Sequence, residues 1–143
     1  MIIVISYFQL LIISFLAATI LPLSSELVLS TMLLTDSFDK YLLLVVASFG
    51  NIFGSSVNWY LGKKILIFKD KKWFPVNEKQ IAKSEMYFKK YGIWSLLLSW
   101  VPIIGDPLTV IAGVLRVNFF TFLLLVSLSK TSRYIFLIFI IFK

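Results

Sequence analysis

The chain has 143 residues and is 59% hydrophobic but only 15% charged, whereas a soluble domain carries about 25% charged residues. Too few polar side chains remain to cover a water-soluble surface, which excludes that class and predicts an all-helical integral membrane protein. The chain contains no cysteine and no histidine, which excludes disulfides, zinc centres built from those residues and hydrolases that depend on histidine.

The first apolar run, residues 1–34, is interrupted in its second half by Pro22, Ser24, Ser25 and Glu26. A helix needs about 20 apolar residues to cross a membrane, and we take the pieces on either side of this break to be too short. We therefore predict a re-entrant hairpin over 1–34, with these residues at its tip. No basic residue precedes the run, which argues against a cleaved signal peptide.

Residues 41–62 are the first uninterrupted stretch that is long enough to form a transmembrane helix. Gly50 and Gly54 have the G-x-x-x-G spacing that lets helices approach closely, and we expect them to pack against a hairpin rather than form a dimer. Asn51 and Asn58 are seven residues apart and share a helix face. Their amides are candidates for lining a polar cavity.

Residues 63–91 are predicted to form a basic loop. Nine lysines and three acidic residues lie between positions 63 and 90, so this segment carries +6 of the net charge of +7. Lysine in short loops marks the cytoplasmic side, and the aromatic residues among the lysines favour anionic lipid headgroups over nucleic acid as the neighbour. The apolar spacing of 78–91 fits either an amphipathic helix on the headgroups or a solvated connector.

The second half of the chain repeats the first. Residues 92–117 are predicted to form another re-entrant hairpin and 118–142 another transmembrane helix, and the break in this hairpin consists of Pro102, Gly105, Asp106 and Pro107. Pro102 and Asp106 have the same Pro-x-x-x-acid spacing as Pro22 and Glu26. The first predicted span enters the cytoplasm and the second leaves it, so the halves are predicted to be inverted, as in secondary transporters.

Lys130 and Arg133 lie near the middle of the last span and share a helix face. Each unpaired charge at the centre of a membrane costs about 2.5 to 3.5 kcal/mol. The acidic residues available as partners are Glu26 and Asp106, so we predict that the last helix packs against both hairpin tips. We expect Arg116 to extend to the membrane interface.

The two acidic residues also have structural interpretations, which we leave open. Asp106 followed by Pro107 fits the cap and first position of a helix, and Glu26 fits a first helical turn, where the helix dipole favours a carboxylate. The functional alternative makes Glu26 a proton carrier. Apolar burial favours a neutral carboxyl group and a nearby cation favours the charged form, so a mobile partner would switch its protonation.

Matching stretches of a known family occur in order along most of the chain: 15–26, 50–62, 90–92, 96–106, Ala112-Gly113, Arg116, and Lys130 with Arg133-Tyr134. With these the chain resembles the DedA superfamily, also called the VTT or SNARE-associated family, and within it the short YqaA-type inner-membrane proteins. The resemblance implies two facing re-entrant hairpins and translocation of lipids such as undecaprenyl phosphate or phospholipids, often coupled to protons, with Glu26 as the acid of the first hairpin. The arginines that the family places in the second hairpin are Ser99 and Gly105 here, and we hypothesise that Lys130 and Arg133 replace them.

The sequence thus predicts a flippase or scramblase of a lipid or lipid carrier in the inner or plasma membrane, with no enzymatic activity, cofactor or metal. Its partners would be membrane lipids rather than nucleic acid, and a homo-oligomer is a further way to cover the hairpin tips. Two alternatives stay open: a transporter of small solutes or ions, and a membrane scaffold or subunit. The candidate substrate and proton pathway consists of Glu26, Asn51, Asn58, Asp106, Lys130 and Arg133.

Overall fold

The computed structural model describes residues 1–19, 24–65, 70–72, 76–101 and 103–143, and within these ranges it contains helices and no strands. This confirms the predicted all-helical class. The elements in chain order are α1 (Ile2–Thr19), α2 (Ser25–Leu33), α3 (Lys40–Lys63), α5 (Glu78–Tyr91), the 3₁₀ helix η1 (Gly92–Leu98), α6 (Gly105–Val114) and α7 (Phe119–Ile141).

Polar side chains fix where four of the helices begin. Ser24, Asp39, Asn77 and Asn118 precede α2, α3, α5 and α7, and each accepts a hydrogen bond from a backbone N–H of the following first turn, at 2.8–3.4 Å. These N–H groups have no partner inside the helix, so the caps stabilise the starts. At α5 the Gln80 side chain also accepts from the Asn77 N–H, which completes a capping box.

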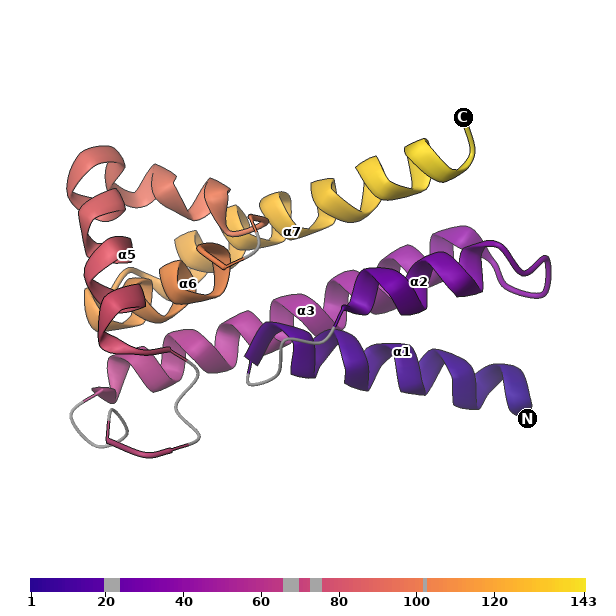
Figure 1. Cartoon of the computed structure of the whole chain (residues 1–143), viewed down its shortest axis with the longest axis horizontal. Helices are drawn as coiled ribbons and strands as arrows, with labels where there is room; N and C mark the ends of the chain where they lie inside the picture. Colours follow the sequence, from indigo (N-terminus) through magenta and orange to yellow (C-terminus); the bar gives the residue numbers. More distant parts are fainter. Residues whose placement is uncertain (20–23, 66–69, 73–75, 102) are drawn as a thin grey trace.

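The helices form two hairpins around α3. Figure 1 shows α1 running from the N-terminus toward the middle of the molecule and α2 running back, while η1 and α6 form a second hairpin that enters from the opposite end. Helix α3 contacts α1, α2, α6 and α7, and α5 packs against α6 and η1. The central position of α3 lets one helix support both hairpins.

Glycines allow the close contacts on α3. A Cβ atom at Gly50 or Gly54 would lie 2.5 or 2.6 Å from a backbone oxygen of α1, so the expected packing of the G-x-x-x-G pair against a hairpin is confirmed. A second close contact joins α3 to α6. A Cβ at Gly62 or Gly113 would lie 1.9 Å from a backbone oxygen of the opposite helix, so neither position accommodates a side chain.

Two buried apolar clusters lie along α7. The first joins α5, η1 and α6 to the N-terminal half of α7, and consists of Phe88, Leu96, Leu108, Ile111, Ala112, Phe122, Leu125 and Val126. The second joins α1, α2 and α3 to its C-terminal half, and consists of Leu10, Leu29, Met32, Leu33, Leu43, Ala47 and Tyr134. Each hairpin therefore has its own core, and the polar residues of α7 lie between the two.

Three helices, α1, α3 and α7, are long and apolar enough to cross a membrane. Helices α3 and α7 correspond to the predicted spans 41–62 and 118–142. Helix α1 is a third, so the expectation that both pieces of 1–34 are too short is wrong for the first piece. Helix α1 is a continuous helix of 18 residues, which reaches about 27 Å at 1.5 Å per residue.

Helix α5 occupies 78–91, as expected from the apolar spacing. Its Phe88 is part of the first apolar cluster, and the helix packs against α6 and η1. One face of α5 is therefore attached to the second hairpin, which argues against a purely solvated connector.

Candidate functional site

Two ion pairs join α7 to the two hairpins. The Lys130 Nζ atom lies 2.8 Å from Asp106 Oδ1, at the start of α6. The Arg133 Nε atom donates to Glu26 Oε1, at the start of α2. The predicted contact of the last helix with both acidic residues is confirmed. A role of these four residues in moving a substrate or a proton stays a prediction.

The two acidic residues occupy the same position in their helices. Glu26 is the second residue of α2 and Asp106 the second residue of α6, so the Pro-x-x-x-acid repeat has a structural counterpart. The interpretation of Asp106 as a helix cap is wrong, because the cap is Ile104 and Pro107 is the third residue of α6. Glu26 does lie in a first turn, where the dipole favours its charge.

Hydroxyl groups next to the two cations hold the same hairpins. Ser129 Oγ accepts from the Trp100 N–H at 3.0 Å and donates to the Leu97 carbonyl at 2.9 Å. The Tyr134 hydroxyl is 2.8 Å from Ser25 Oγ. The contact of Ser129 was not predicted from the sequence, and Tyr134 was named only among the residues of the family resemblance. The sequence feature that could have indicated both contacts is a hydroxyl residue directly beside each cation of the last helix.

The two ion pairs differ in burial on the α7 side. The side chain of Lys130 is 4% exposed and that of Asp106 38%. The corresponding values are 25% for Arg133 and 32% for Glu26. Lys130 is therefore enclosed by protein, whereas the Arg133 side chain is partly exposed.

Two apolar grooves meet at Arg133. One groove, of about 460 Å³, is lined by Leu97, Trp100, Leu128, Ser129, Ser132, Arg133 and Phe136. The other, of about 410 Å³, is lined by Glu26, Ser30, Trp100, Arg133, Phe136, Leu137, Ile140 and Ile141. The side chains of Trp100, Leu128 and Phe136 are exposed on the outer surface. The walls of the two grooves are thus largely apolar. Arg133 contributes a cation to both grooves, and Glu26 contributes an anion to the second.

Asn51 and Asn58 lie between helices rather than along these grooves. Asn58 Nδ2 donates to the Ala18 carbonyl at 2.7 Å and to Thr109 Oγ1 at 3.1 Å, which links α1, α3 and α6. Asn51 Nδ2 donates to the Ser14 carbonyl of α1 at 3.3 Å. Both Oδ1 atoms are buried and have no hydrogen-bond partner among the residues that the structure describes. A part in a substrate or proton pathway stays a prediction for both.

The remaining tip residues have packing roles where they are described. Pro22 and Pro102 lie outside the described residues. Ser24 caps α2 and Ser25 binds Tyr134. At Gly105 a Cβ atom would lie 2.1 Å from the Ser99 carbonyl oxygen. The two positions where the family resemblance implies arginines are therefore in backbone contact, which leaves no room for an arginine side chain at 105.

Arg116 follows α6 and is exposed, with φ of 54°. Its N–H donates to the Gly113 carbonyl at 3.0 Å and the next N–H donates to the Ala112 carbonyl at 2.9 Å. These two bonds are typical of an α-helix that is terminated by a residue with left-handed backbone conformation, which here is Arg116. An exposed side chain here agrees with the expected extension to the interface.

Comparison with known proteins identifies the family. The VTT domain family matches residues 21–143. The inner membrane protein YqaA of Escherichia coli is 36% identical over 91% of this chain and 87% of its own length, and an uncharacterized protein of Haemophilus influenzae is 34% identical over 89% and 82%.

A more distant relative carries a functional name. Undecaprenyl phosphate transporter A of Staphylococcus aureus is 26% identical over 62% of this chain and 48% of its own length. No solved structure matches. The family match, the inner-membrane relatives and the three apolar helices agree, and the chain belongs to the VTT-domain (DedA) family of multi-pass membrane proteins.

Proposed function

We propose that the protein translocates a lipid or lipid carrier with an anionic headgroup, and that Arg133 receives this headgroup. The observation that carries the proposal is the position of Arg133 at the junction of the two apolar grooves. A lipid must keep its chain in an apolar medium while its charge crosses, and unpaired charge inside a membrane is unfavourable. A guanidinium beside an apolar groove meets both requirements, because it binds phosphate through paired hydrogen bonds.

The location of the grooves favours a lipid over a small solute. A soluble substrate calls for an enclosed cavity, whereas the walls of these grooves include side chains that are exposed on the outer surface of the protein. The name of the Staphylococcus aureus relative, undecaprenyl phosphate transporter A, supports the same substrate class. The function proposed is therefore transport rather than catalysis, with membrane lipids as the partners.

The proposal includes re-entrant hairpins in inverted orientation. In Figure 1 the N-terminus, the α2–α3 connection and the C-terminus lie at one end of the molecule, and α5 lies at the other. Because the chain has no cysteine, single cysteines at Ser37, Phe142 and Lys71 give a direct test of the opposite orientation of α3 and α7. We expect Ser37 and Phe142 to be labelled from one side of the membrane and Lys71 from the other.

Liposome reconstitution tests the transport itself. Vesicles would contain undecaprenyl phosphate or phospholipids with a headgroup fluorophore, and a membrane-impermeant reductant would report the label that reaches the outer leaflet. We expect flux with the wild type and a decrease of at least about ten-fold with Arg133→Ala, since a hydrogen bond to a charged group contributes about 1.5 to 3 kcal/mol. Lys79→Ala is the matched control, because Lys79 is an exposed basic residue of α5.

We further propose that Glu26 carries the coupled proton. Glu26 lies beside Arg133 in the second groove, so a phosphate that binds Arg133 competes with the carboxylate and leaves it free to take up a proton. We expect Glu26→Gln to retain binding but to lose the response of flux to an imposed pH gradient. Wild-type flux with an unchanged pH response in this variant would disprove the coupling, and no flux of any lipid with correctly folded wild type would disprove the transport proposal.

A further inference from the structure

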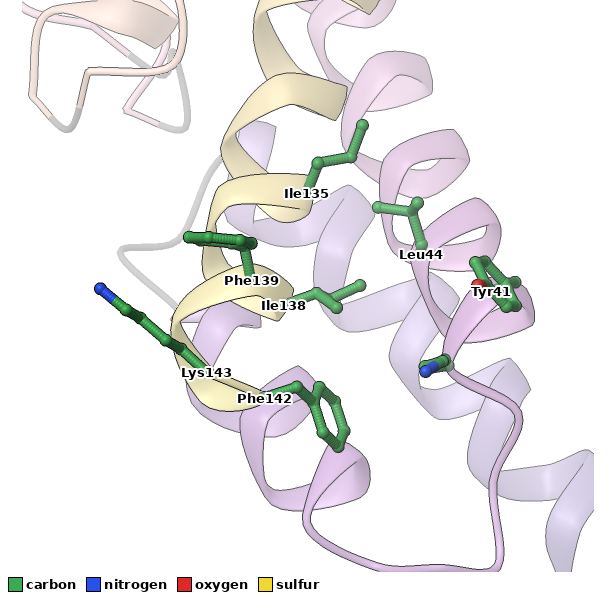
Figure 2. Close-up of a pocket in the computed structure, with 8 residues that line it drawn as sticks. Tyr41, Leu44, Ile135, Ile138, Phe139, Phe142 and Lys143 are labelled. Carbon is green, nitrogen blue, oxygen red and sulfur yellow. The ribbon is translucent and has the colours of Figure 1, made fainter.

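A third apolar pocket lies away from the ion pairs, where the start of α3 approaches the end of α7. It has a volume of about 470 Å³, within the range of roughly 300 to 1,000 Å³ typical of ligand sites. In Figure 2, Tyr41 and Leu44 form the α3 wall, and Ile135, Ile138 and Phe142 form the α7 wall. The pocket therefore has an apolar interior.

The mouth of this pocket is basic. Its lining includes Lys40 and Lys143 and no acidic residue. The Lys40 Nζ atom lies 5.6 Å from the centre of the Tyr41 ring and 5.3 Å from the centre of the Phe142 ring, a distance at which a cation is attracted to an aromatic face. Lys143 extends outward from the pocket in Figure 2. One cation is thus held over the apolar walls, and the other is directed away from them.

We propose that this pocket binds one anionic phospholipid, with the phosphate at Lys40 and an acyl chain between α3 and α7. The charge pattern argues for this occupant: an uncharged chain fits the walls, and the Lys40 ammonium group at the mouth complements a phosphate. A second copy of the chain in a two-fold arrangement would bring the lysines of both copies together, which is unfavourable. None of the ion-pair residues lines this pocket, so the site is independent of the transport proposal.

Quenching by brominated lipids tests the site, since the wild type has no cysteine. A bimane label is placed on Ile135→Cys, which lines this pocket, or on Phe49→Cys as the matched control. Phe49 is also exposed and lines an apolar pocket on α1 and α3 that has no charged residue. Each labelled protein is incorporated into bilayers that contain brominated phosphatidylglycerol or brominated phosphatidylcholine, and the quenching gives the relative affinity of the two lipids.

We expect phosphatidylglycerol to be preferred at Ile135 and not at Phe49. Each basic residue near the membrane surface contributes about 1 kcal/mol, which corresponds to about a five-fold preference per lysine. Lys40→Gln should reduce the preference to that of the Phe49 control, whereas Lys143→Gln, at a side chain directed away from the pocket, should leave it unchanged. Equal preference at both labels, or an unchanged preference in Lys40→Gln, would overturn the proposal. Protection of the Ile135 label from both lipids would also overturn it, because a second copy would then be the occupant.

Discussion

The different burial of the two ion pairs predicts that two similar substitutions have very different effects on stability. Asp106→Ala and Glu26→Ala each remove a carboxylate from the second position of a helix and from an ion pair with α7. The loss of the favourable helix-dipole interaction is therefore common to both. What differs is the cation left behind, because the Lys130 side chain is 4% exposed and that of Arg133 is 25% exposed.

The magnitude follows from this difference. An enclosed cation without a partner costs about 3 to 5 kcal/mol, so Asp106→Ala should lower the free energy of unfolding by about 3 kcal/mol or more. The side chain of Arg133 is longer and partly exposed, so when its partner is lost it can extend toward the headgroup region, and Glu26→Ala should cost less than Asp106→Ala. Replacing both members of the enclosed pair, in Asp106→Ala with Lys130→Met, should recover most of the loss, because the buried charge is gone.

Reversible unfolding in mixed detergent micelles, followed by the fluorescence of the four tryptophans, measures these free energies. Purified variants are compared at one pH and one protein concentration, and the double variant supplies the coupling energy of the pair. Equal losses for Asp106→Ala and Glu26→Ala would refute the reasoning from burial. A double variant that is no more stable than Asp106→Ala would show that Lys130 is not the source of the cost.

Three further substitutions test other contacts. Tyr134→Phe leaves the Ser25 hydroxyl without its partner and should cost about 1 to 3 kcal/mol in the same unfolding assay; a variant as stable as wild type would show that this hydrogen bond contributes nothing. Gly113→Ala places a Cβ atom 1.9 Å from the Trp59 carbonyl oxygen, so α3 and α6 must separate. The free energy of unfolding should fall by about 1 to 3 kcal/mol. An unchanged midpoint of thermal unfolding would contradict the contact. Asn77→Ala removes the cap of α5 and should speed hydrogen exchange in its first turn by about five-fold, corresponding to about 1 kcal/mol; the amides of α7 serve as the internal control.

The sequence was sufficient to predict α3, α7 and the ion pairs. Helices α3 and α7 lie within two residues of the expected ranges 41–62 and 118–142, because an uninterrupted apolar stretch ends where polar caps and lysines begin. The pairing of α7 with Glu26 and Asp106 was predictable because unpaired charge in an apolar medium is costly and few acidic residues were available.

Other features depend on how helices cross, which periodicity does not specify. The enclosure of Lys130, the contact of Gly62 with α6, and the hydroxyl contacts of Ser129 and Tyr134 all require the rotation of each helix about its axis. The length of α1 was misjudged for a different reason. A proline indicates where a helix ends. The number of residues that a helix needs to cross the membrane depends on the tilt of the helix and on the thickness of the bilayer.

The arrangement along α7 indicates which hairpin moves more easily. Lys130 and Arg133 are about one turn apart, and each hairpin packs on a separate half of the helix. Separating the second hairpin from α7 leaves an enclosed cation unpaired, whereas separating the first leaves one that already reaches the surface. Separating the second hairpin therefore costs more, and each 1.4 kcal/mol of difference between the two costs corresponds to about a ten-fold difference in population. A ligand anion that replaces Glu26 at Arg133 lowers the smaller cost further, so α2 is the element that we expect to move during transport, with α6 remaining attached to α7.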